Sequence, residues 1–192
     1  MASTAPPAAL ALPMQELLAR LLGEARQRPI KQVMLVGAAR GVGTTFIARH
    51  WAAQLASAFG NVLTIEVRHD AADEYSTVES PAALVERGPV ASITMSQNTC
   101  LGLACGDCTL PVEWLDSFGL IVWDVPPLTA APVALVLARE VDAIVLLTQA
   151  HRTRRQVATH AAQRLQESGG RLLGVVLNRS LNFIPAWIYR LL

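Results

Sequence analysis

The chain has 192 residues, of which 52% are hydrophobic and 16% charged, and its formal net charge is +1. This near-neutral balance gives no electrostatic basis for binding nucleic acid, so we expect no nucleic-acid partner. The length fits one domain with a sizeable core, and no apolar run is long enough to span a bilayer. So few charges indicate that a partner or a membrane surface covers part of the protein.

The N-terminal segment is rich in Ala and Pro and has no basic residue before Gln15. It therefore does not resemble a signal peptide, and residues 1–14 are predicted to be a disordered leader of a cytoplasmic protein. A first helix is predicted over 15–26, because Leu17, Leu18, Leu21 and Leu22 recur at helical spacing.

The next segment has the form of a phosphate-binding loop. An apolar strand is predicted over 32–37, a glycine-rich turn follows, and a helix is predicted from Thr44 to Phe59, ended by Gly60. Such loops wrap backbone N–H groups around phosphate oxygens at the positive end of a helix dipole. An ordinary strand–turn–helix connection is the alternative, in which glycine only permits the tight turn.

The loop lacks its usual lysine. The typical pattern ends Gly-Lys-Ser/Thr, but here Gly43 is followed by Thr44. The single lysine of the chain, Lys31, precedes the strand. Arg40 lies inside the loop and either leans over a bound phosphate or is a solvated side chain at the loop tip. The sequence thus predicts a loop able to hold a nucleotide without the cation that best stabilises phosphoryl transfer.

The remaining chain alternates continuously apolar strands with helices, a pattern typical of a parallel sheet covered on both faces. Strands are predicted over 61–67, 119–124, 142–148 and 171–178, and helices over 81–87, 111–118, 132–139 and 153–168. Residues 70–80 are polar and loop-like, and 90–106 favours no single element. The predicted fold class is α/β, with three layers and a parallel central sheet.

Three cysteines lie close together, at positions 100, 105 and 108. An odd number in a cytoplasmic chain argues against a disulfide framework. Cys105 and Cys108 have a spacing found in zinc and redox sites, but no second pair and no histidine at ligand spacing accompany them. Small thiols within a loop are therefore the favoured interpretation.

Three segments together resemble the MinD/ParA-like P-loop ATPases: the loop Gly37–Thr45, the strand and turn Gly119-Leu-Ile-Val-Trp-Asp-Val-Pro-Pro127, and Gly174-Val-Val-Leu-Asn178. Within that group, the Asp-Val-Pro-Pro turn and the run Ala150–Arg155 are most similar to the bacterial tyrosine kinases (BY-kinases) of capsule and exopolysaccharide assembly. The resemblance spans roughly residues 15–179 and implies a three-layer P-loop NTPase fold.

The resemblance also implies a site. Five consecutive residues would hold the phosphates of ATP or ADP through backbone N–H groups, with Arg40 beside them: Gly41, Val42, Gly43, Thr44 and Thr45. The Thr45 hydroxyl and Asp124 would hold Mg²⁺, which prefers such hard oxygen ligands. Asn178 and Arg179 would contact the base. The structural alternatives are a strand-end carboxylate for Asp124 and a turn residue for Asn178.

Several positions depart from the family pattern. Thr44 replaces the catalytic lysine, Ala39 the second lysine, and Glu66-Val67-Arg68 an acidic motif with two aspartates. The C-terminal tyrosine cluster is also missing, since the chain has only Tyr75 and Tyr189. The Glu-x-x-Arg-x-x-Arg assembly motif of the kinases is absent from the first helix, where only Glu16 and Arg20 partly match it. Loss of one oxyanion or cationic donor costs about 10²–10³ in rate, so efficient phosphoryl transfer is not expected.

The C-terminal segment 181–192 is apolar and aromatic, and Pro185 suits the first turn of a helix. Phe183, Trp187 and Ile188 would form part of an apolar face. Such a segment can lie on a membrane surface, dock in a groove of a partner, or fold back on its own domain.

The function favoured by the resemblance is that of a catalytically degenerate BY-kinase-like accessory protein of polysaccharide assembly. Its expected partner is a membrane-embedded polysaccharide co-polymerase or a similar protein, together with homo-oligomerisation, and its expected location is cytoplasmic, at the periphery of the inner membrane. The alternative is a slow MinD/ParA-like ATPase that dimerises on ATP and positions a partner. An active tyrosine kinase is disfavoured, and a ligand-free interaction module is the remaining structural option.

Overall fold

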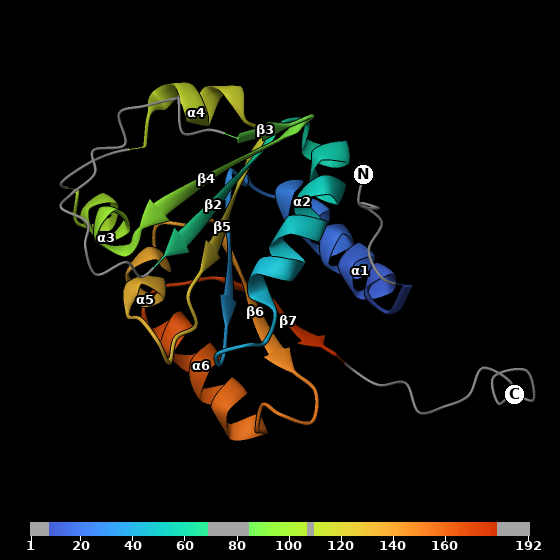
Figure 1. Ribbon diagram of the computed structural model, residues 1–192, viewed down its shortest axis with the longest axis vertical. Helices are drawn as coiled ribbons and strands as arrows, with labels where there is room; N and C mark the ends of the chain where they lie inside the picture. The colour runs from blue at the N-terminus through green and yellow to red at the C-terminus, as the bar shows by residue number, and fades with distance from the viewer. Residues whose placement is uncertain (1–7, 69–84, 107–109, 180–192) are drawn as a thin grey trace, which may run out of the picture.

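The structure is a computed structural model that describes residues 8–68, 85–106 and 110–179. Their elements follow the chain in this order (Figure 1): α1 (Ala8–Ala25), β1 (Gln32–Gly37), α2 (Thr44–Phe59), β2 (Val62–Arg68), β3 (Val85–Arg87), β4 (Val90–Ser96), α3 (Gln97–Cys105), α4 (Val112–Ser117), β5 (Leu120–Val125), α5 (Val133–Leu137), β6 (Ala143–Gln149), α6 (Arg155–Glu167) and β7 (Leu172–Asn178). The predicted bounds of β1 and α2 are confirmed.

The strands form one sheet in the order β3-β4-β2-β5-β1-β6-β7. All neighbouring pairs are parallel except β3 with β4. β1 and β5 lie near the centre, and their side chains are almost all buried because helices cover both faces. The carboxyl ends of β1, β2, β5, β6 and β7 therefore lie at one edge of the sheet.

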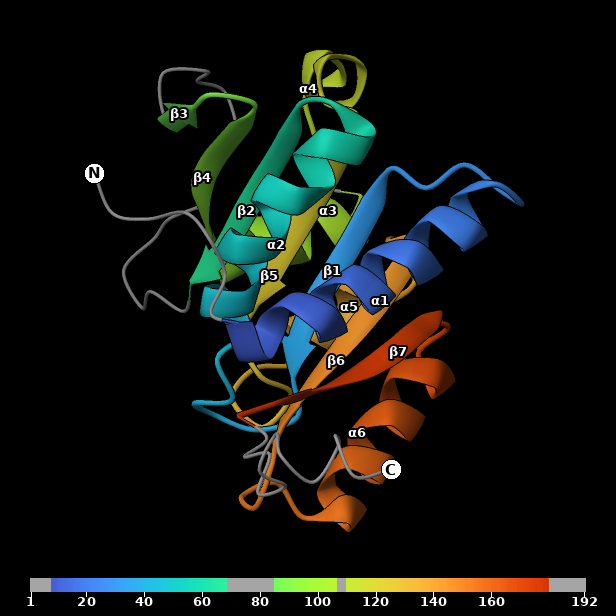
Figure 2. The same ribbon diagram turned by 90° about the vertical axis from the view of Figure 1, so that its right-hand side faces the viewer.

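Helices form a layer on each face of the sheet (Figure 2). α1 and α2 pack on one face, where Val33 and Leu35 of β1 point. α3, α4, α5 and α6 contribute to the core on the other face, where Met34 and Val36 point. Successive side chains of a strand face opposite sides, so β1 joins the two cores. The predicted three-layer α/β class is confirmed.

Two predicted element boundaries are wrong. A helix is predicted over 81–87, but the part of this segment that the structure describes, Val85–Arg87, is a strand. It pairs antiparallel with β4 across a turn in which Gly88 has φ 65°. The three-residue strand covers the outer edge of β4, which outweighs local helix propensity. The first helix begins at Ala8 instead of Gln15, and Met14 is buried, so part of the expected leader belongs to α1.

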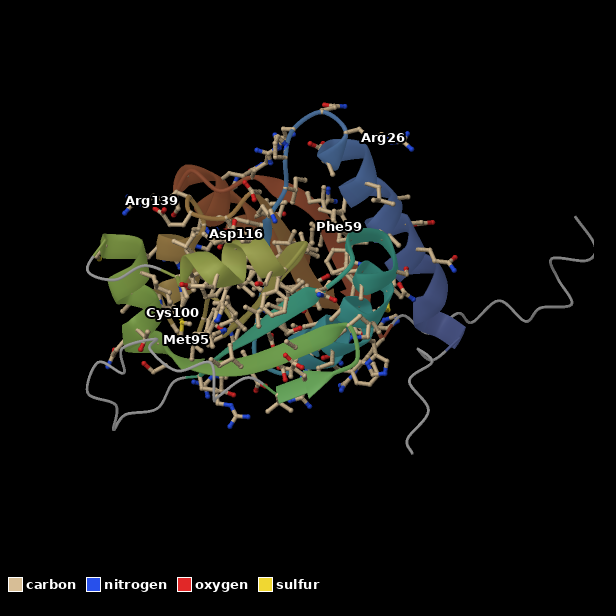
Figure 3. The ribbon with its side chains drawn as sticks, turned by 90° about the horizontal axis from the view of Figure 1, so that it is seen from above. Arg26, Phe59, Met95, Cys100, Asp116 and Arg139 are labelled. Carbon is tan, nitrogen blue, oxygen red and sulfur yellow. The ribbon has the colours of Figure 1, made fainter. Side chains whose placement is uncertain are left out.

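The segment 90–106, which the sequence left open, divides into β4 and α3. The Ser96 hydroxyl marks the boundary, because it accepts a hydrogen bond from the backbone N–H of Thr99 (3.1 Å) and caps α3. Figure 3 shows Cys100 of α3 beside Met95 at the end of β4. Both side chains are buried in the same core cluster, so the Cys100 thiol is a packing group.

Candidate functional site

The loop between β1 and α2 is a concave turn at the start of a helix. Gly41 (φ 75°) and Gly43 (φ 93°) adopt left-handed conformations that L-residues rarely occupy, and Gly43 caps α2. The loop base is anchored by hydrogen bonds from the backbone N–H of Ala38 to the Leu147 carbonyl (2.9 Å) and from the N–H of Leu128 to the Gly37 carbonyl (3.2 Å). This backbone has the shape predicted for an anion-binding loop.

A cavity of about 270 Å³ lies in this concave turn. Its walls are loop and helix residues 39 and 41–46, together with Glu66 and Val67 from β2 and residues 124–127 at and after the end of β5. Five of the predicted nucleotide-binding residues, Gly41 to Thr45, therefore line one cavity. Arg40, Asn178 and Arg179 are not among its lining residues.

Asp124 is the most perturbed acid of the site. Its side chain is 4% exposed, and in the sheet it lies opposite Leu35 of β1 and Glu66 of β2. Burial raises the pKa of Asp124 from 3.8 to about 6, with a further upward contribution from the negative charge of Glu66. A hydrogen bond with the Thr45 side chain and the charge of Arg49 act in the opposite direction on this pKa.

The expected metal ligands thus lie together. The Thr45 side chain interacts with the Asp124 carboxylate and lowers its pKa, and both residues line the cavity. Both are hard oxygen donors, so they fit one side of a Mg²⁺ site whose other ligands are water and phosphate. Their arrangement fits a divalent ion bridging a bound nucleotide, as the resemblance implies.

Glu66 is held by two arginines. Its carboxylate forms ion pairs with Arg49 of α2 (3.1 Å) and Arg68 of β2 (3.2 Å), whose side chains are 66% and 54% exposed. The sequence alone reveals Glu66 and Arg68 as a departure from the family pattern but does not single out Arg49. The available signal was spacing, because Arg49 lies four residues after Thr45 and thus on the same face of the helix. Arg68 therefore stands where the family pattern has its second aspartate, and Arg49 adds a second guanidinium group beside Glu66.

Asn178 lies against the loop, outside the cavity. Its side-chain nitrogen donates to the Val42 carbonyl (2.8 Å), and its side-chain oxygen accepts from the backbone N–H of Arg179 (2.8 Å). Asn178 is 5% exposed, and Arg179 has a left-handed backbone conformation (φ 55°). Contact of either residue with a base remains a prediction.

Other sequence predictions are placed only in part. Cys100 is buried and Cys105 is exposed, and Cys108 lies outside the described residues. Phe183, Trp187 and Ile188 also lie outside them. Within the described ranges no three His, Cys, Asp or Glu residues gather as a metal cluster. Nor does any helix in those ranges combine the length and apolarity needed to cross a membrane.

Comparison with known sequences finds a match to a bacterial tyrosine kinase over part of the chain. No family model matches the chain. A tyrosine-protein kinase CpsD from Streptococcus agalactiae is 36% identical over 62 residues, which are 32% of this chain and 27% of that protein. The match therefore spans about a quarter of the length of its curated relative.

Solved structures resemble the whole fold. The kinase domain of the Escherichia coli tyrosine kinase ETK has a TM-score of 0.67 and 20% identity, over 96% of this chain and 86% of that domain. The septum site-determining protein MinD from Pyrococcus horikoshii, solved with Mg-ADP, has a TM-score of 0.59 and 14% identity, over 83% of this chain and 76% of that protein.

The fold is similar to that of MinD-like P-loop proteins, and the cavity lies at the carboxyl edge of its sheet. Among such proteins, the chain is close to the bacterial tyrosine kinases, since the curated sequence match and the fold similarity both point to them.

Proposed function

We propose that this protein is a catalytically degenerate BY-kinase-like accessory protein of capsule or exopolysaccharide assembly. It would bind ATP or ADP weakly and act through protein partners. The observation that carries the proposal is Thr44, which stands in a well-formed phosphate loop at the position of the catalytic lysine.

The loss of the lysine affects turnover more than binding. Backbone N–H groups and the helix dipole do not depend on the residue type at position 44, so the loop can still attract phosphate oxygens. In the transition state, charge spreads over the transferred phosphoryl group, and a missing cation there costs about 10²–10³ in rate. Binding without efficient turnover is the expected outcome.

The arginines around Glu66 weaken the case for a tightly held metal. Arg49 and Arg68 neutralise the second carboxylate of the site, and their positive charges oppose the approach of Mg²⁺. Thr45 and Asp124 supply only one side of the coordination shell. We therefore expect nucleotide binding to depend little on magnesium.

Equilibrium binding of labelled ATP and ADP, with and without Mg²⁺, tests this proposal together with a hydrolysis assay. We expect measurable binding that magnesium changes little, and negligible turnover. Thr44→Lys should raise hydrolysis by about 10²–10³, whereas Thr44→Ala, which removes the hydroxyl without adding charge, should not. Rapid turnover by the wild-type protein would contradict the proposal.

The role in polymer assembly requires its own test. The expected partner is a membrane-embedded polysaccharide co-polymerase, and the expected location is cytoplasmic, peripheral to the inner membrane. Deletion of the gene should alter the amount or chain length of the surface polymer. The wild-type gene should restore the polymer without the substitution Thr44→Lys. Normal polymer in the deletion strain would contradict this role.

The alternative is a slow MinD/ParA-like ATPase that dimerises on ATP. The pairing of Thr45 with Asp124 favours it, because that half of a metal site is retained. Tight, magnesium-dependent ATP binding accompanied by dimerisation would favour this alternative over the degenerate kinase.

A further inference from the structure

The buried side chain of Asn178 connects two segments 136 residues apart in sequence. Its nitrogen donates to the Val42 carbonyl and its oxygen accepts from the backbone N–H of Arg179, both at 2.8 Å. An amide N–H can only donate, so the oxygen of the carboxamide must face Arg179 and the amino group must face Val42. The contact with the loop is therefore a directed hydrogen bond.

This hydrogen bond fixes the orientation of one loop peptide. Val42 C=O and Gly43 N–H belong to the same planar trans peptide group, so they point in opposite directions. Asn178 lies outside the cavity and binds the carbonyl, and the N–H of Gly43 therefore points the other way, toward the cavity that Gly43 lines. In the flipped orientation a carbonyl oxygen would face the phosphate and repel it.

Asn178 is itself rigidly placed. It is the last residue of β7 and pairs with Gln149 of β6, and its own carbonyl accepts from the N–H of Ala150 (2.9 Å). It also packs closely on the loop, since a Cβ added to Gly43 would lie 2.5 Å from the Asn178 nitrogen. The end of β7 thus holds the loop through a residue that does not line the cavity.

We propose that Asn178 is a positioning residue, which holds the Val42–Gly43 peptide so that the Gly43 N–H faces a bound phosphate. It acts through the loop and does not touch the ligand. The identification of that ligand as the phosphate of a nucleotide rests on the proposed function. It gives the carboxamide a role in the loop in place of the base contact that the family resemblance implies.

The substitution Asn178→Asp removes the side-chain N–H donor and keeps the side chain nearly the same shape. The aspartate keeps an acceptor for Arg179 but places a carboxylate oxygen against the Val42 carbonyl. We expect the ¹⁵N order parameters of Gly41 and Gly43 to fall from about 0.85 to below about 0.6 in the ligand-free protein. In magnesium-free buffer we expect the affinity for ADP to fall about tenfold or more. Asn178→Ala, which adds no charge, should loosen the same two glycines and serves if the aspartate variant does not fold.

Thr148→Val is the matched control. The Thr148 hydroxyl is also buried and donates to a backbone carbonyl, but that carbonyl belongs to Val176 of β7 (3.2 Å) and not to the loop. Its loss should lower stability without changing the order parameters of Gly41 and Gly43. Unchanged glycines in both Asn178 variants, or an equal loss of order in Thr148→Val, would overturn the inference. Failure of the wild-type protein to bind ADP would instead contradict the proposed function, and the order parameters would still test the role of Asn178.

Discussion

At the scale of single residues, Asp124 illustrates how a binding site opposes stability. Its carboxylate is buried beside Glu66, and burial raises its pKa to about 6. An acid with a raised pKa holds its proton more tightly in the folded than in the unfolded protein. Its effect on stability is therefore unfavourable above about pH 6 and fades as the pH falls toward 3.8, the ordinary value of its pKa.

Replacing Asp124 with asparagine should remove this penalty. Asparagine keeps an oxygen for the Thr45 hydroxyl and carries no charge, so the free energy of unfolding at pH 7 should rise by about 2–3 kcal/mol, with little gain near pH 4. Urea unfolding across this pH range measures the difference. Asp116→Asn, at an exposed carboxyl labelled in Figure 3, is the control and should not raise the free energy of unfolding at pH 7. A gain that is equal at both pH values would show that the charge of Asp124 is not its source.

The residues of the cavity could be predicted only where local sequence defines them. Gly41 to Thr45 follow from the strand, the glycines and the helix start, and Asp124 from its place at the end of an apolar strand. For Asn178 the family resemblance implies a base contact, and the sequence gives no sign that β7 ends against a loop 136 residues away. The ion pair of Arg49 with Glu66 also depends on the packing of α2 on β2, which spacing along one helix predicts only in part.

At the scale of elements, two glycines have opposite structural roles. Gly119 precedes β5 and donates its N–H to the Asn61 carbonyl (2.7 Å), and an added Cβ there would overlap the backbone carbonyl of Phe59 at the end of α2. Gly23 lies in α1 with open space around the position of a Cβ. The first glycine is required by the approach of α2 to β5, whereas the second only weakens its helix.

Alanine at these two positions should therefore shift stability in opposite directions. Gly119→Ala should lower the free energy of unfolding by about 1–3 kcal/mol, because backbone must move to admit the methyl group. Gly23→Ala should raise it by about 0.5–1 kcal/mol through helix propensity. Urea midpoints, compared at equal m-values, give both changes. A destabilised Gly23→Ala would mean that α1 requires more space at this point than the structure shows.

Element prediction succeeded where burial and periodicity agree. β1, β5 and β6 are continuously apolar and are found as predicted, because burial on both faces leaves a clear pattern. The helix predicted over 81–87 is wrong at β3, because a strand of three residues is too short to show a periodic pattern. Its strand conformation comes from pairing with β4, which local sequence does not record.

At the scale of the whole molecule, one edge of the sheet carries the features that bear on function. The loop after β1 lines one cavity with Glu66 of β2 and Asp124 of β5, and Asn178 at the end of β7 contacts the same loop. The chain therefore passes from the loop contact at Asn178 directly into residues 180–192.

Binding of the full chain to lipid vesicles tests the C-terminal segment. We propose that Phe183, Trp187 and Ile188 insert at a membrane surface, because aromatic and aliphatic side chains bury area there. Cosedimentation with neutral vesicles should be reduced about tenfold or more by the double substitution Trp187→Glu and Ile188→Glu, since each loses over a kcal/mol of apolar transfer free energy. Anionic lipid should add little, because the segment carries one basic residue, Arg190.

The melting temperature of the same variant distinguishes the remaining possibilities. If the segment binds membrane, the double substitution should leave the melting temperature unchanged, because the core of the domain is not altered. A lower melting temperature would mean that the segment packs on its own domain. Wild-type protein that fails to sediment with vesicles while the variant melts normally would contradict membrane insertion and leave a protein groove as the binding site. The backbone amides of Gly41 and Gly43 would then show whether binding of a partner to the C-terminal segment changes the loop through Asn178.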